Sequence, residues 1–125
     1  MATILVAEDN PSSRRSLVRL LKMQGYEVLT AGDAHQATAL AHRGKPDLLL
    51  LDVGMPPIDG LTFLSLLRTE PAGATLPVIL ITGMCDDNTR SRAEELGVKE
   101  FLVKTQFEPE RLLELIKQHI GTDGE

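Results

Sequence analysis

The chain has 125 residues and 42% of them are apolar, a size and composition that fit one domain with one sizeable core. Lys and Arg number 13 against 18 Asp and Glu, and the formal charge of −5 excludes the basic surface that a direct nucleic-acid binder needs. The longest apolar runs, among them residues 48–51, are too short to cross a membrane and the amino terminus lacks a signal-peptide pattern, so we expect a soluble, cytoplasmic protein.

The first part of the chain alternates short apolar segments with amphipathic ones. Residues 3–7 predict a strand, and Asn10-Pro11 then predicts the start of a helix, because Asn caps helices and Pro favours the first helical position. Gly25 ends this helix. A second strand is expected over 27–31 and a second helix over 33–43.

The same alternation continues to the end of the chain. Residues 47–51 include four consecutive leucines, which indicates a central strand buried on both faces, since alternation disappears when neither face meets water. The remaining predicted elements are a helix over 61–69, a strand over 77–82, a helix over 88–96, a strand over 99–103 and a last helix that begins at Glu108-Pro109.

This order of elements predicts a doubly wound α/β fold with five parallel strands and helices on both faces of the sheet. There is no internal repeat, so residues 1–125 are expected to form one domain, with 121–125 as a tail or the start of a linker. Sheets of this kind bind ligands at the carboxyl ends of their strands.

Reactive side chains follow four of the five predicted strands at that end. They are Glu8 and Asp9 after the first strand, Asp52 after the third, Thr82 after the fourth and Lys104 after the fifth. Clustered carboxylates repel one another, so they must share a proton or recruit a cation, and an all-oxygen cluster suits Mg²⁺. An Asp can act as the nucleophile that forms an aspartyl phosphate, with Lys and Thr holding the other oxygens.

The sequence resembles the response regulator receiver family over nearly its whole length. The motifs that carry the resemblance are ILVAEDN at 4–10, DLLLLDVGMPPIDG at 47–60, VILITG at 78–83 and FLVK at 101–104. The resemblance implies the flavodoxin-like (βα)₅ arrangement with strand order 2-1-3-4-5. It also implies that a sensor histidine kinase or a histidine phosphotransfer protein phosphorylates Asp52.

The resemblance implies roles for the other residues too. Glu8, Asp9 and Asp52 would bind Mg²⁺ together with the backbone carbonyl of Gly54. Thr82 and Lys104 would bind the phosphoryl oxygens. Phe101 stands at the aromatic switch position of the family, although a plain core aromatic is an equal interpretation of this residue.

Two features depart from the family pattern. Receivers often carry a proline in cis after the lysine, whereas this chain has Lys104-Thr105. We therefore expect a trans bond, because cis costs about 3 to 4 kcal/mol without proline. Gly54 places no side chain beside the phosphate, and the family resemblance suggests that this position and Met84 tune the rate of dephosphorylation.

A second function stays open, namely a degenerate receiver that binds partners without being phosphorylated. An aspartyl-phosphate phosphatase is a poor alternative, because Gly54 stands where that class needs a second Asp. The output partner or effector domain is expected on the face formed by the fourth helix, fifth strand and fifth helix. Whether the chain acts alone or as part of a longer regulator stays open.

Overall fold

The computed structural model describes residues 2–54, 59–83, 86–104 and 108–120. The elements are β1 (Thr3–Ala7), α1 (Pro11–Met23), β2 (Glu27–Ala31), α2 (Ala34–Arg43), β3 (Leu48–Asp52), α3 (Gly60–Arg68), β4 (Val78–Thr82), α4 (Asp87–Glu95), β5 (Glu100–Val103) and α5 (Pro109–Ile120). Every predicted strand and helix is confirmed, and the bounds shift by one or a few residues. The shift at β3 matters most, because the strand includes Asp52 rather than ending before it.

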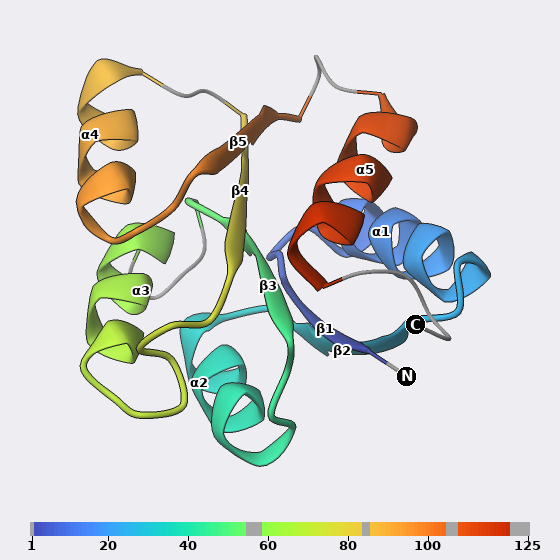
Figure 1. Cartoon of the computed structure of the whole chain (residues 1–125), viewed down its shortest axis with the longest axis horizontal. Coiled ribbons are helices and arrows are strands. Elements are labelled where there is room, and N and C mark those ends of the chain that lie inside the picture. The colour runs from blue at the N-terminus through green and yellow to red at the C-terminus, as the bar shows by residue number, and fades with distance from the viewer. Residues whose placement is uncertain (1, 55–58, 84–85, 105–107, 121–125) are drawn as a thin grey trace.

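The five strands form one parallel sheet in the order β2-β1-β3-β4-β5. Helices α1 and α5 cover one face of this sheet, and α2, α3 and α4 cover the other (Figure 1). The order reverses direction between β1 and β3, which is where doubly wound folds open a crevice at the carboxyl ends of the strands. The predicted fold class and strand order are therefore confirmed.

The leucine run in β3 shows how the sheet is buried on both faces. Leu49 and Leu51 pack into the core beneath α2, α3 and α4, whereas Leu48 and Leu50 pack into the core beneath α1 and α5. All four leucines are at most 1% exposed. Alternate residues thus supply separate cores, and the central strand holds both layers of helices in place.

Asx caps fix where the helices begin beside the carboxyl ends of the strands. Asn10, Asp33, Asp59 and Asp86 each accept a hydrogen bond from the backbone N–H three residues later. Such a cap contributes about 1 kcal/mol and sets the first turn of its helix. In the part of the chain that the structure describes, no helix is long and apolar enough to span a membrane.

Candidate functional site

Three carboxylates meet at the crevice between β1 and β3. Ala7 pairs with Leu51, so the next residues, Glu8 and Asp52, leave neighbouring strands side by side. Glu8 is 2% exposed and Asp52 is 6% exposed, while Asp9 is exposed to solvent. Glu8, Asp9 and Asp52 each offer one oxygen, and these oxygens lie within 4.8 Å of one another. The fold brings the predicted acidic cluster together.

Lys104 lies between the two buried carboxylates. Its Nζ is 2.7 Å from Oε1 of Glu8 and 3.1 Å from Oδ2 of Asp52. Its backbone N–H donates to the carbonyl oxygen of Thr82 at 2.8 Å, which fixes the chain where β5 ends. These contacts hold the lysine in a chain without the usual proline. Thr105 lies outside the described residues, so the trans geometry of the Lys104-Thr105 bond stays a prediction.

The charges of the cluster are incompletely balanced. Burial, followed by the hydrogen bond with Asp52, raises the pKa of Glu8 to about 7, although Lys104 acts in the opposite direction. Burial alone would raise the pKa of Asp52, but hydrogen bonds with Glu8, the Gly54 amide and Lys104 outweigh it and lower this pKa. Asp52 is therefore the more readily ionised of the two buried carboxylates, and Glu8 loses its proton only around neutral pH.

The residues present fit a bound Mg²⁺ ion. Burial disfavours the charge of Lys104, yet hydrogen bonds to Glu8 and Asp52 raise its pKa, so one cation already compensates part of the cluster. Three carboxylates with one ammonium leave excess negative charge, and hard oxygen donors of this kind suit Mg²⁺. Gly54 follows in the same turn, where its N–H donates to Oδ1 of Asp52 at 3.2 Å.

The two remaining predicted residues lie on β4 and β5. Thr82 ends β4 and is 5% exposed, one position after the residue that pairs with Asp52. Phe101 lies in β5 and is partly buried against the core beneath α2, α3 and α4. The guanidinium of Arg90 lies over its ring, 4.6 Å from the ring centroid. Phe101 is thus part of the core, and its role as a switch stays a prediction. Met84 lies outside the described residues.

Two residues that were not assigned to the predicted site support the cluster. Arg14 of α1 donates from Nη1 to the carbonyl oxygen of Glu8 at 2.8 Å, which fixes the turn that carries the acidic pair. Gly60 begins α3 so close to β3 that a Cβ atom there would lie 2.3 Å from the carbonyl oxygen of Asp52. The motif contained Gly60, but only the three-dimensional approach shows why a side chain is excluded. Nothing in the sequence pointed to Arg14.

The family described as the response regulator receiver domain matches residues 4–117 of the chain. The chain belongs to this family. Receiver domains take part in two-component signalling, in which they interact with histidine kinases and output domains. The predicted family is therefore confirmed over most of the sequence.

Individual relatives agree with this assignment. The probable transcriptional regulator ycf27 of Galdieria sulphuraria is 41% identical over 109 residues, which cover 87% of this chain and 41% of the relative. The chain thus spans less than half the length of that regulator.

Solved structures share the fold. The chemotaxis protein CheY4 of Vibrio cholerae has a TM-score of 0.89 and 30% identity, with 96% of this chain and 99% of that chain covered. The receiver domain of sensor histidine kinase PA1611 from Pseudomonas aeruginosa has a TM-score of 0.86 and 28% identity, with 97% and 98% covered. That structure contains a magnesium ion coordinated in its active site cleft.

Proposed function

We propose that this receiver accepts a phosphoryl group on Asp52 from a sensor histidine kinase or a histidine phosphotransfer protein, in a Mg²⁺-dependent reaction. The observation that carries the proposal is the environment of the Asp52 carboxylate. It is buried, its pKa is lowered, and its two oxygens receive hydrogen bonds from the Gly54 N–H and the Lys104 ammonium. Such a carboxylate is ionised and oriented, as a nucleophile must be.

Each neighbouring residue has a distinct part in the proposed reaction. An Asp52 oxygen forms the new bond to phosphorus, and the histidine nitrogen of the donor keeps the electron pair of the bond that breaks. Glu8, Asp9, Asp52 and the Gly54 carbonyl would hold Mg²⁺, which supplies positive charge to the phosphoryl oxygens. PA1611 supports this assignment, because its receiver domain coordinates a magnesium ion in its active site cleft.

Two further residues would stabilise the phosphorylated form. Lys104 already reaches Asp52 from the end of β5 and would contact a phosphoryl oxygen once the carboxylate is esterified. The hydroxyl of Thr82, at the neighbouring end of β4, would contact another. A Cβ atom at Gly54 would lie 3.9 Å from Oδ1 of Asp52, so glycine leaves that side open to the water that removes the phosphoryl group.

We propose that the chain is a signalling phosphoacceptor, which catalyses its own phosphorylation and dephosphorylation and acts on no other substrate. We also propose a cytoplasmic location, where the proposed kinase partner would act on it. Residues 1–125 are proposed to be one domain, with 121–125, outside the described residues, as a tail or linker. Output would pass through a partner or an attached effector domain rather than through direct nucleic-acid binding.

The proposed output surface is the face formed by α4, β5 and α5. Helix α4 buries only Ala93 within its bounds, so few apolar contacts fix its position. Two of its side chains also contact other elements, through the Arg92 ion pair with Asp59 at 3.6 Å and the Arg90 contact with Phe101. Both contacts are weak, at about 1 kcal/mol or less each. A shift of Thr82 toward a phosphate would therefore move α4 at low cost.

Phosphate uptake distinguishes this function from that of a degenerate receiver. The protein is incubated with a small acyl phosphate and Mg²⁺, and incorporated phosphate is measured over time for the wild type, Asp52→Asn and Asp59→Asn. We expect uptake in the wild type and in Asp59→Asn, which preserves a helix cap in the same loop, and none in Asp52→Asn. A wild type that takes up no phosphate would establish the degenerate alternative.

The output surface is tested by amide hydrogen exchange, with and without a phosphoryl mimic bound at Asp52. We expect changed protection across residues 86–104, where α4 and β5 lie. Changes confined to α1 and α2, with residues 86–104 unaffected, would show that the output surface lies elsewhere.

A further inference from the structure

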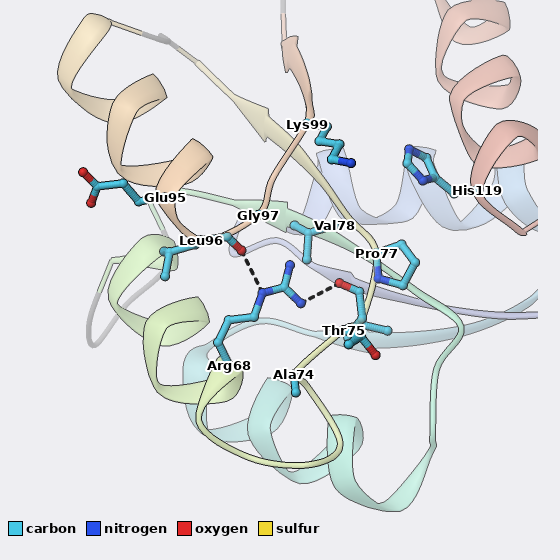
Figure 2. Close-up of a pocket in the computed structure, with 11 residues that line it drawn as sticks. Arg68, Ala74, Thr75, Pro77, Val78, Glu95, Leu96, Gly97, Lys99 and His119 are labelled. Carbon is cyan, nitrogen blue, oxygen red and sulfur yellow. Dashed lines mark hydrogen bonds between the residues drawn. The ribbon is translucent and has the colours of Figure 1, made fainter.

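A cavity lies at the amino ends of the strands, which is the opposite end of the sheet from the acidic cluster. Its volume is about 540 Å³, within the range of small-molecule sites. The turn before β4, the end of α4 and the start of β5 form its walls, and α5 contributes His119 (Figure 2). Because it faces the amino ends of β4 and β5, this cavity is separate from the crevice that holds Asp52.

Three basic side chains line the cavity of a chain whose net charge is −5. Arg68 comes from α3, Lys99 from the residue before β5 and His119 from α5. Figure 2 shows Lys99 and His119 pointing toward one another, while the carboxylate of Glu95 points away from the cavity. Glu100 pairs with His119 at 3.6 Å but is not among the lining residues, so the three basic lining side chains face one lining carboxylate, that of Glu95.

Arg68 is held rigidly and still has donors to offer. Its Nε donates to the carbonyl oxygen of Leu96 at 2.8 Å, and its Nη1 donates to those of Gly73 and Leu76 at 2.8 and 2.7 Å. Within the described residues, no acceptor is bonded to Nη2, and Figure 2 shows this end of the guanidinium directed into the cavity. A fixed guanidinium loses little entropy on binding an anion.

The helix ends nearby do not cancel this charge. Helices α3 and α4 both end beside the cavity, and a helix end carries only about half a negative charge. The carbonyl of Leu96 at the end of α4 is already bonded to Arg68. The two cationic groups, Lys99 and the unbonded end of Arg68, therefore outweigh the two helix ends, and His119 is a further donor.

We propose that this cavity binds the phosphate monoester of a small organic molecule. A doubly charged phosphate matches several basic donors, one of them a guanidinium of fixed orientation. The apolar residues Leu76, Pro77 and Val78 line the same cavity and offer a surface to the organic part of the ligand. Binding would draw together the α3–β4 turn, the end of α4 and the start of β5.

The proposal is tested by titrating the protein with adenosine monophosphate and with inorganic phosphate, without Mg²⁺, while amide chemical shifts are recorded. Adenosine serves as the comparison without phosphate. We expect adenosine monophosphate to shift the amides of residues 74–78 and 95–99 with a Kd of about 1 mM or below, and adenosine to shift none. The same binding is expected in Asp52→Asn, so its outcome is independent of the phosphoacceptor proposal.

Three variants distinguish specific binding in this cavity from nonspecific electrostatic attraction. Lys99→Gln combined with His119→Gln should weaken binding about tenfold, and Ala74→Phe should fill the cavity and abolish it. Lys117→Gln removes an exposed charge of α5 outside the cavity and should leave binding unchanged. Shifts that map to the Asp52 crevice, equal weakening by Lys117→Gln, or no shifts at millimolar ligand would each overturn the proposal.

Discussion

Replacing the buried carboxyl of Glu8 by an amide should stabilise the metal-free protein at alkaline pH. Glu8→Gln keeps the shape of the side chain and removes its charge. Glu8 is 2% exposed, and its pKa is raised from an ordinary value of 4.5 to about 7 by burial and by Asp52. The folded protein therefore holds this proton more tightly than the unfolded chain does.

The sign and size of the effect follow from proton linkage. A raised pKa of the folded state means that the contribution of Glu8 to stability is fully present below pH 4.5 and is lost as the pH rises to about 7. At about 1.4 kcal/mol per pKa unit the shift corresponds to about 3 kcal/mol. Because the amide also loses its charged contact with Lys104, we expect a net gain of about 1 to 3 kcal/mol at pH 8.

The measurement is urea unfolding of the wild type and Glu8→Gln at pH 5 and pH 8, with chelator present. The variant should have the higher free energy of unfolding at pH 8, and its advantage should disappear at pH 5, where Glu8 is protonated. Glu94→Gln, an exposed site on α4, controls for the general effect of one negative charge. If Glu8→Gln is destabilised equally at both pH values, the assigned electrostatics of the site are wrong.

Further predictions concern residues around this site. Gly60→Ala should lower the free energy of unfolding by about 1 to 3 kcal/mol, because its Cβ would overlap the Asp52 carbonyl. The control Gly83→Ala should leave the free energy of unfolding unchanged, because its Cβ would meet nothing within 4 Å. Equal losses for the two variants in urea unfolding would contradict this. Asp9→Ala should weaken Mg²⁺ binding in calorimetry more than it weakens the fold, and an unchanged Mg²⁺ affinity would remove Asp9 from the metal site. Arg90→Gln should increase hydrogen exchange in α4, and unchanged exchange would show that its contact with Phe101 does not hold the helix.

The fold could be predicted because local signals and periodicity agree along the whole chain. The leucine run at 48–51 indicated a strand buried on both faces, and its residues do divide between the two cores. Helix starts were also readable, since Asn10-Pro11 combines a cap with a residue suited to the first turn. Bounds shifted where a cap such as Asp86 moved the start of a helix.

Only the part of the site that depends on where the strands end could be predicted from the sequence. Parallel strands end at one edge, so the sequence was enough to group Glu8, Asp52 and Lys104. It could not show that Lys104 bridges both carboxylates, because this depends on side-chain geometry. The cavity beside Arg68 was missed for a similar reason, as its walls come from segments that meet only in the folded chain.

Reductive trapping of the phosphorylated protein tests the central proposal most directly. The protein is incubated with an acyl phosphate and Mg²⁺ and treated with borohydride, which reduces an aspartyl phosphate to an alcohol, and the modified residue is located by mass spectrometry. Asp52 is predicted to be the reduced residue, and omission of Mg²⁺ should abolish the modification. Reduction at another carboxylate, or an unmodified Asp52 in protein that has taken up phosphate, would contradict the assignment.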